Sequence, residues 1–138
     1  RGVMVREARR GDAITGAETF MRAFGWPTDY APLMAQLLEP SVDLDTVHHY
    51  LALIDGQAAG TCSLLRWGEY GVLGSAGVLP EHRGGGAATA LSTRAASDAR
   101  AQGVETLMLQ TEAGTPLERL LRINGFSRAF VRACYTLT

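Results

Sequence analysis

The chain has 138 residues, 46 % of them hydrophobic, and a formal net charge of −1. Its length suits one domain with a buried core, which we expect to span residues 1–138. The balanced charge argues against nucleic-acid binding, which needs a concentrated basic surface. No apolar run approaches the roughly 20 residues of a membrane span, and no secretory signal precedes the first predicted strand. These features predict a cytoplasmic protein without nucleic-acid or membrane partners. The sequence begins at Arg1, which leaves open whether it is a piece of a longer protein.

Cysteine and lysine usage limits the available chemistry. The two cysteines, Cys62 and Cys134, form neither a CxxC pair nor a zinc-binding spacing. Both lie in apolar, strand-like segments, so we expect buried free thiols and no bound metal. All 13 of the Lys and Arg residues are arginine, so no lysine serves as a base or forms a Schiff base.

The first half of the chain predicts two helices between strands. Apolar residues recur at helical spacing behind Asp12, a good N-cap, and the second helix stops before Pro40. Turn residues at 55–57 and 68–69 separate three strand-like runs. The predicted elements are one strand, two helices and three strands, at residues 3–6, 12–24, 30–39, 47–54, 58–67 and 70–79.

The second half predicts alternating helices and strands. An alanine-rich run ending at Gly103 indicates a helix, and Thr115 with Pro116 fits the start of another. The predicted elements are helix, strand, helix and strand, at residues 87–102, 106–111, 115–123 and 126–137. The order β-α-α-β-β-β-α-β-α-β predicts an α/β fold with a mixed, mostly antiparallel sheet flanked by helices.

The segment "VLPEHRGGGAATAL", from Val78 to Leu91, places three glycines between a strand and a helix. The first amides of a helix lack intrahelical acceptors, and the helix dipole adds positive charge there. Glycines let backbone amides approach a phosphate closely. The loop is therefore either an anion site or a flexible turn. It is not a P-loop, which needs a lysine, nor a GxGxxG dinucleotide loop.

This segment resembles the coenzyme A-binding motif of the GNAT family of N-acetyltransferases, Q/R-x-x-G-x-G/A after a strand. Arg83, Gly86 and Ala88 occupy its three defined positions. The "NGF" at 124–126 is similar to the Gly-Phe that follows the family's last helix. The element order agrees as well, so the resemblance covers essentially the whole chain.

The resemblance implies acetyl-CoA or CoA as the cosubstrate. It implies that the backbone of Val78 and Leu79 pairs with the pantetheine arm, beside a strand with a bulge and a neighbour that splays away. The pyrophosphate would bind the amides of the loop and helix start, where Arg83 adds a charge or supports the loop. These residues are Arg83, Gly84, Gly85, Gly86, Ala87 and Ala88.

The family's usual catalytic positions hold no proton carriers here. The frequent base positions correspond to Val72 and Gly74, and the frequent acid position to Leu121. Glu112, which follows the splayed strand, is the catalytic residue that we predict, against the alternative of a solvated loop carboxylate. Other candidates are Tyr70, Cys134, Tyr135, His48 and His49; strand alternation places one histidine on each face of the sheet.

The acceptor site is expected between the first two helices and the strand ends. Trp26 and Tyr30 are candidate walls, and a set of carboxylates favours a cationic amine or forms only a solvated surface: Asp29, Glu39, Asp43 and Asp45. The sequence thus predicts an N-acyltransferase that moves an acetyl group directly to a primary amine of a small molecule or peptide. The alternatives are a non-catalytic acyl-CoA sensor domain and an unrelated α/β module. A homodimer is possible.

Overall fold

The computed structural model describes residues 2–138. The strands are β1 Val3–Glu7, β2 Val47–Ile54, β3 Gln57–Trp67, β4 Tyr70–Val78 and β5 Thr106–Leu109. The helices are α1 Ala13–Ala23, α2 Ala31–Ser41, α3 Ala87–Ala101 and α4 Pro116–Ile123. Short 3₁₀ turns lie at Arg10–Asp12, Thr28–Tyr30 and Pro80–His82.

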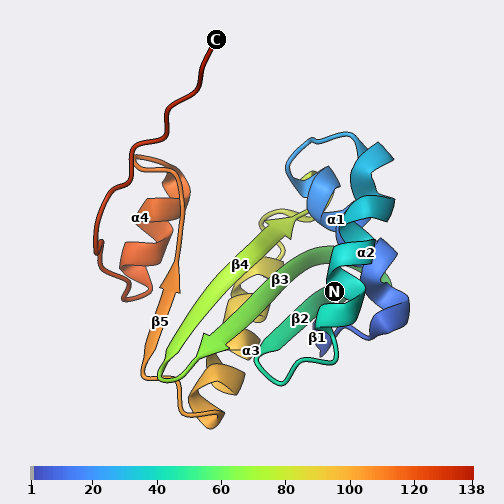
Figure 1. Cartoon of the computed structure of the whole chain (residues 1–138), viewed down its shortest axis with the longest axis horizontal. Helices are drawn as coiled ribbons and strands as arrows, with labels where there is room; N and C mark the ends of the chain where they lie inside the picture. The colour runs from blue at the N-terminus through green and yellow to red at the C-terminus, as the bar shows by residue number, and fades with distance from the viewer. Residues whose placement is uncertain (1) are drawn as a thin grey trace.

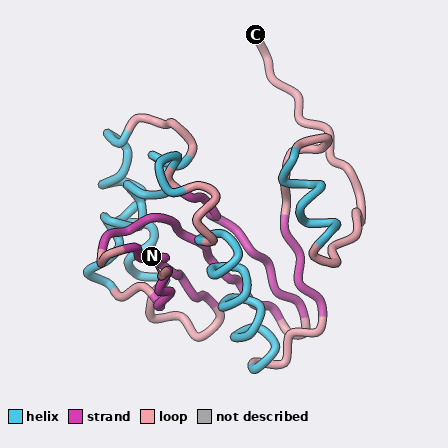
Figure 2. The backbone as a smooth tube through the Cα atoms, turned by 180° about the vertical axis from the view of Figure 1, so that it is seen from behind, coloured by secondary structure: helices cyan, strands magenta, loops and turns pink. Residues whose placement is uncertain are grey.

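The sheet is mixed, with strand order β1-β2-β3-β4-β5. The pairs β1–β2, β2–β3 and β3–β4 are antiparallel, and β4–β5 is parallel. Helices α1 and α2 lie against one face and α3 against the other (Figures 1 and 2). The predicted mixed α/β fold, mostly antiparallel and flanked by helices, is therefore confirmed.

Tight turns set the antiparallel half of the sheet. Asp55 and Gly56 connect β2 to β3 with φ values of 51° and 76°. Two consecutive residues with positive φ match the right-handed twist of the strands that they join. The turn pairs Ile54 with Gln57, and a bulge between Ala52 and Leu53 follows.

The main core lies between the sheet and α3. Small side chains on one stripe of α3, among them Ala95 and Ala99, let the helix approach the sheet closely, while Leu91 fills the remaining space. Tyr50 and Leu64 are among the largest fully buried side chains. The hydroxyl of Tyr50 donates a 2.7 Å hydrogen bond to Asp98, so the buried polar group is satisfied.

Asp12 stands at the predicted helix start but plays a different role. Its carboxylate accepts from the Arg9 amide at 2.7 Å and from the Arg6 guanidinium at 2.7 and 2.9 Å. The ion pair lowers the pKa of Asp12 from 3.8 to about 2. Asp12 therefore ties β1 to the turn before α1 rather than capping α1.

The C-terminal segment contains the main departure from prediction. No strand forms over residues 126–137 among the residues that the structure describes. A strand needs a paired neighbour as well as a strand-like sequence. Here Arg128 and Arg132 bind Glu118 and Gln110, which holds the segment beside α4 and leaves it exposed.

Two smaller predictions were also wrong. Helix α2 continues through Pro40 to Ser41, because a proline in the last turn removes only one hydrogen bond from a helix that is already ending. Cys134 is exposed, since the segment around it has no partner, whereas Cys62 is buried as predicted. Burial raises the pKa of the Cys62 thiol to about 11.

Candidate functional site

Strands β4 and β5 separate partway along their length. Their pairing begins at Tyr70–Thr106 and ends at Leu73–Leu109. Beyond this point β4 continues to Val78 and remains paired with β3, while the chain after β5 leads to α4. The divergence is visible in Figure 1. The sheet thus has a branch point, which leaves one edge of β4 without a neighbouring strand.

A β-bulge lies directly after the branch point. Thr61 pairs with Gly77 and Ser63 with Gly74, so β4 has one more residue than β3 in this interval. Ser75 has a φ of 47°, and its carbonyl accepts a 2.9 Å bond from the Thr61 hydroxyl. The bulge that the resemblance implied is therefore present, and it redirects the free edge of β4.

Val78, the last residue of β4, and Leu79 after it face in different directions. Leu79 is buried and donates its amide to the Ala59 carbonyl of β3 at 2.8 Å. Because backbone groups alternate along a strand, the amide and carbonyl of Val78 face the free edge. The Val78 amide is therefore available for pairing with a strand-like ligand, while its carbonyl accepts from Arg83 at 3.3 Å and Leu79 forms part of the core.

The glycine loop ends in a left-handed residue at the start of α3. Gly84 and Gly86 have φ values of 79° and 89°, which side-chain-bearing residues rarely adopt. The amides of Arg83 and Gly85 donate to Pro80 and His82 carbonyls at 3.3 and 3.4 Å.

The remaining amides of the loop are free for a ligand. No side chain caps α3. Within residues 2–138, no hydrogen bond uses the amides of Gly84, Gly86, Ala87 or Ala88. These N–H groups at a helix N-terminus form an anion-binding geometry.

The side chain of Arg83 supports the loop. Its guanidinium donates to the Ala23 carbonyl at 2.8 Å and to the Val78 carbonyl at 3.3 Å. The sequence left open whether Arg83 adds a charge for the ligand or supports the loop. These contacts correspond to support, and they connect the loop to the C-terminal end of α1.

The predicted catalytic residue, Glu112, is exposed in the loop after β5. Its carbonyl accepts from the Thr115 hydroxyl at 2.8 Å, but no hydrogen bond or ion pair of its carboxylate occurs within the described residues. Gly74 and Val72 lie on β4 at the branch point, and a Cβ on Gly74 would have no atom within 4 Å. The space at Gly74 is open, and Gly74 itself brings no titratable group to it.

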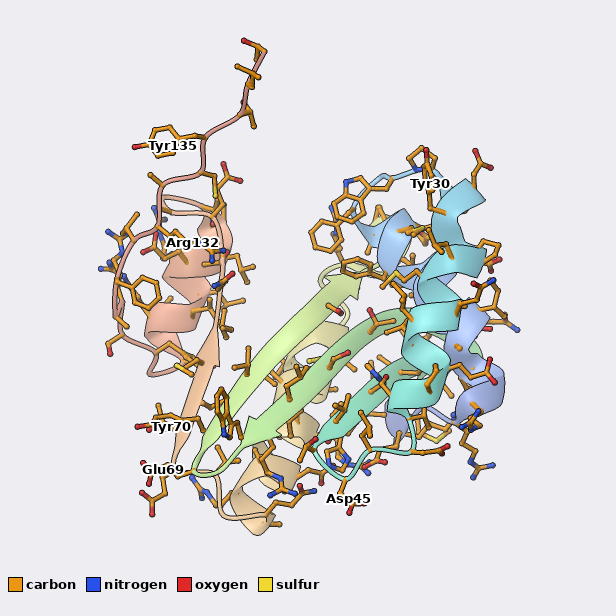
Figure 3. The ribbon with its side chains drawn as sticks, viewed as in Figure 1. Tyr30, Asp45, Glu69, Tyr70, Arg132 and Tyr135 are labelled. Carbon is orange, nitrogen blue, oxygen red and sulfur yellow. The ribbon has the colours of Figure 1, made fainter. Side chains whose placement is uncertain are left out.

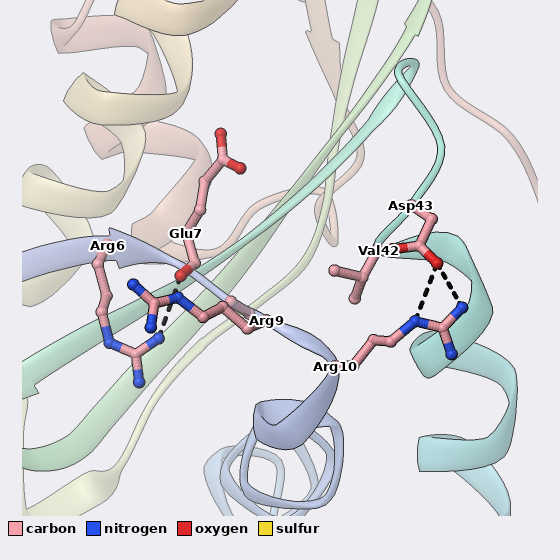
Figure 4. Close-up of a pocket in the computed structure, with 7 residues that line it drawn as sticks. Arg6, Glu7, Arg9, Arg10, Val42 and Asp43 are labelled. Carbon is pink, nitrogen blue, oxygen red and sulfur yellow. Dashed lines mark hydrogen bonds and ion pairs between the residues drawn. The ribbon is translucent and has the colours of Figure 1, made fainter.

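The predicted set of acidic residues does not assemble. Arg10 forms ion pairs with Glu39 and Asp43, beside a shallow pocket formed with β1 (Figure 4). Asp45 and Tyr30 lie at opposite ends of the molecule (Figure 3). These carboxylates therefore do not surround one cationic acceptor.

Aromatic rings cluster near the free edge of β4. Phe24 stacks on Trp26 with a centroid distance of 5.2 Å, and Phe20 packs against both rings at 4.9 and 5.6 Å. Phe24 also approaches Gly77, where an added Cβ would lie 3.3 Å from its ring. Phe24 and Trp26 are about half exposed, so an apolar surface adjoins the branch.

The two histidines of β2 lie on opposite faces, as strand alternation predicted. His48 binds Glu7 at 3.0 Å and Gln102, which follows α3, at 3.2 Å. His49 lies on the α2 side, with Nδ1 2.6 Å from the Ser63 hydroxyl and Nε2 2.7 Å from the Ser41 hydroxyl. Sequence analysis missed the two serines; His49 at a strand position facing the helices was the only signal.

Tyr70, another candidate, belongs to an apolar groove at the other end of β4. The groove is lined mainly by Leu65, Trp67, Tyr70, Val72 and Met108. Tyr70 is half exposed there and forms no described hydrogen bond with the loop or with β2. The groove lies away from the glycine loop, and through Val72 and Met108 it reaches the branch point.

Metal-ligand clusters and membrane-spanning helices are both absent from the described residues. Residues 2–138 contain no group of three or more His, Cys, Asp or Glu side chains placed to hold a metal ion. In the same residues, no helix has the length and apolar character needed to cross a membrane.

The structure thus combines a sheet that opens between β4 and β5 with a glycine-rich helix start. Residues 13–126 match the model of the acetyltransferase (GNAT) family. The chain belongs to this acetyltransferase family, and the resemblance noted from the sequence is confirmed. No curated protein sequence gave a significant match.

Solved structures share the fold at low sequence identity. An acetyltransferase of Trypanosoma brucei has a TM-score of 0.79 and 16 % identity, with 99 % of this chain and 100 % of that chain covered. A predicted acetyltransferase from Clostridium acetobutylicum, solved with acetyl-CoA, has a TM-score of 0.78, 14 % identity and 96 % coverage of both chains. An aminoglycoside acetyltransferase from an uncultured soil sample has a TM-score of 0.79, 18 % identity and 100 % coverage of both.

Proposed function

We propose that this protein transfers an acetyl group from acetyl-CoA to a primary amine of a small molecule or peptide. The observation that carries the proposal is the continuity of two free backbone surfaces. The unpaired edge of β4 leads directly into the unbonded amides at the start of α3. The family match and a relative solved with acetyl-CoA support the same reading. We further propose that the domain spans residues 1–138 and acts in the cytoplasm.

The described residues fit acetyl-CoA as a substrate. The amides of Gly84, Gly86, Ala87 and Ala88 would bind its pyrophosphate, because they have no hydrogen-bond partner among the described residues and lie at the positive end of α3. Val78 would pair with the pantetheine arm through its backbone. The thioester would then lie near the branch point, where Gly74 leaves open space.

The transfer needs no covalent enzyme intermediate. The amine attacks the thioester carbonyl, the C–N bond forms, the C–S bond breaks and its electron pair leaves on sulfur. The ammonium must lose one proton before attack, and the new amide loses a second, which neutralises the thiolate. Glu112 remains a proposed proton acceptor, although its exposed carboxylate makes no contact with the branch point among the interactions described for residues 2–138.

The aromatic surface suggests which amines are accepted. Phe24 and Trp26 adjoin the free edge of β4, whereas two of the four predicted carboxylates are paired with Arg10. An acceptor whose amine lies beside an apolar or aromatic group would bury that group against these rings. Structural neighbours include an aminoglycoside acetyltransferase and a ribosomal-protein-alanine N-acetyltransferase, so relatives of this fold act on both kinds of amine.

Calorimetry and thiol release together test the proposed function. We expect acetyl-CoA and CoA to bind, and free thiol to appear at a rate that depends on the added amine. The amine panel should include arylalkyl amines, aminoglycosides and peptide N-termini. Binding without release for every amine would favour a non-catalytic acyl-CoA sensor. Absence of binding at millimolar acetyl-CoA would contradict both the acetyltransferase and the sensor.

We also propose that a second copy of the chain covers the C-terminal segment, here taken together with α4 as residues 116–138. Residues 116–138 carry four arginines and one glutamate, while the rest of the chain is net acidic. Apolar side chains of the segment are strongly exposed, including Ile123, Phe130, Tyr135 and Leu137. Figure 3 shows Arg132 and Tyr135 on the segment, far from α2. Charge complementarity and exposed apolar area both favour association between copies.

Sedimentation velocity tests this association. The wild type should sediment as a dimer at micromolar concentration. The double variant Phe130→Glu, Tyr135→Glu should sediment as a monomer, because it places charge in the apolar contact. A Thr138→Glu control at the chain end should remain dimeric. A wild type that is monomeric throughout the concentration range would show that the segment instead packs on its own chain.

A further inference from the structure

We propose that His49 is the proton acceptor of the transfer reaction and that it acts through the hydroxyl of Ser63. The inference rests on the proposed acetyl transfer, and it assigns the proton acceptor to His49 in place of Glu112. It also gives Ser41 a role, which is to hold the imidazole in one orientation.

The three side chains form one continuous chain of hydrogen bonds. Ser63 Oγ lies 2.6 Å from His49 Nδ1, and His49 Nε2 lies 2.7 Å from Ser41 Oγ. Ser41 Oγ also lies 2.6 Å from the Leu38 carbonyl, to which only the hydroxyl can donate. The side chains come from β3, β2 and α2, so the tertiary fold assembles them.

The Leu38 contact fixes the direction of every proton in the chain. Since Ser41 donates to a carbonyl, its oxygen accepts from His49 Nε2–H. The neutral imidazole then carries no hydrogen on Nδ1, which accepts from the Ser63 hydroxyl. Ser63 is left with lone pairs that can receive a further proton. This is the arrangement of a hydroxyl activated by an oriented base.

Ser63 stands at the branch point of the sheet. It is the register partner of Gly74, one residue beyond the last β4–β5 pair, at Leu73–Leu109. Paired residues on antiparallel strands place their side chains on the same face, with Cβ atoms about 5 Å apart. Gly74 has no side chain, and a Cβ there would touch nothing within 4 Å. The missing side chain therefore leaves a path from the branch point to the Ser63 oxygen.

The proton balance is simple. The acceptor ammonium gives one proton to Ser63 Oγ, directly or through one water, as Ser63 passes its own proton to His49 Nδ1. The free amine forms the C–N bond, the C–S bond breaks, and CoA leaves as a thiolate. That thiolate takes the second proton from the amide nitrogen. His49 returns its proton to solvent after product release.

The electrostatic surroundings keep His49 ready to accept a proton. Burial, followed by the neighbouring charge of His48, lowers the pKa of His49 below its ordinary 6.5. The two side chains that contact the imidazole, Ser41 of α2 and Ser63 of β3, are neutral. The Ala8 amide, which follows β1, donates to the His49 carbonyl at 2.7 Å. Within residues 2–138, His48 is the one titratable group acting on its protonation.

The test compares His49→Gln, Ser63→Ala and the matched control His48→Gln. Each of the first two should lower kcat/KM about 100-fold, at the low end of what a general base contributes. The double variant should lose no more than either single variant, because the pair acts as a unit. Acetyl-CoA affinity and the melting temperature, measured on every variant, separate this loss from misfolding. If His49→Gln fails to fold, Ser63→Ala still tests the relay, because it removes only one oxygen atom.

The pH profile gives a readout that a structural role would not change. In the wild type, kcat/KM falls as the pH drops through the pKa of His49, because the imidazolium accepts no proton. This acidic limb should disappear in His49→Gln. In His48→Gln the acidic limb should persist, and its midpoint should move to a slightly higher pH. The reason is that this variant removes a charge that lowers the pKa of His49.

Three results would overturn the proposal. In the first, His49→Gln and Ser63→Ala both release thiol at normal rates and keep the acidic limb. The relay would then be wrong, but the proposed function would stand. No amine-dependent release by the wild type would remove both. An acetyl group on Ser63 in wild-type peptides would replace the relay with covalent transfer.

Discussion

Gly85→Glu should weaken acetyl-CoA binding at least ~100-fold, which corresponds to about 2.7 kcal/mol of binding free energy. Gly85 is not in the left-handed region, so the change does not strain the backbone there, although its Cβ would lie 3.3 Å from the His82 carbonyl. The new carboxylate would stand beside the free amides of the loop and repel the pyrophosphate. Calorimetric titration with acetyl-CoA measures the effect.

Gly85→Gln is the matched control, since it has nearly the same shape without the charge. It should lose less affinity than the glutamate variant, and the difference should shrink at high salt as the charge is screened. Unchanged melting temperatures would show that the loss is local. Equal, wild-type affinity in both variants would contradict the assignment of the loop as the pyrophosphate site.

Gly77→Val should lower the free energy of unfolding by about 3 kcal/mol, at the upper end of the cost of overpacking a core. A Cβ at this position would lie 2.7 Å from the Cβ of Ala23 and 3.3 Å from the ring of Phe24. Either α1 or β4 must move to accommodate it. Urea unfolding followed by circular dichroism measures the change.

Gly74→Ala is the control for this substitution. It adds a Cβ to the same strand at a position where nothing lies within 4 Å, so stability should change by less than about 1 kcal/mol. If both variants unfold alike, β4 does not pack against α1 as described. The contrast also separates the two uses of small residues on this strand, which are close packing at Gly77 and open space at Gly74.

Local sequence signals predicted most of the fold. Asp55-Gly56 and Gly68-Glu69 set two hairpin turns, and Thr115 with Pro116 set the start of α4. These signals work because turn and cap residues act on their own backbone. The glycine loop was recognised for the same reason, since its glycines and the helix start that follows them are contiguous in the sequence.

Features that depend on distant partners were predicted poorly. The last strand was expected from the strand-like sequence of residues 126–137, but pairing requires a neighbour that sequence does not supply. The carboxylates Glu39 and Asp43 are paired by Arg10, some thirty residues away in sequence. His49 needed Ser63 and Ser41 to become a candidate base, and nothing in the sequence brings these three together.

The contact between Arg83 and the Ala23 carbonyl has a consequence for the thermodynamics of ligand capture. A glycine-rich loop has high conformational entropy, which a flexible site would lose on binding its ligand. Here the guanidinium anchors the loop to the end of α1, so much of that entropy is already lost when the chain folds. The cost of ordering the loop is thereby moved from the binding equilibrium to the folding equilibrium. If the loop binds acetyl-CoA as proposed, the ligand meets a preorganised surface, and the stability of α1 becomes one of the determinants of its affinity.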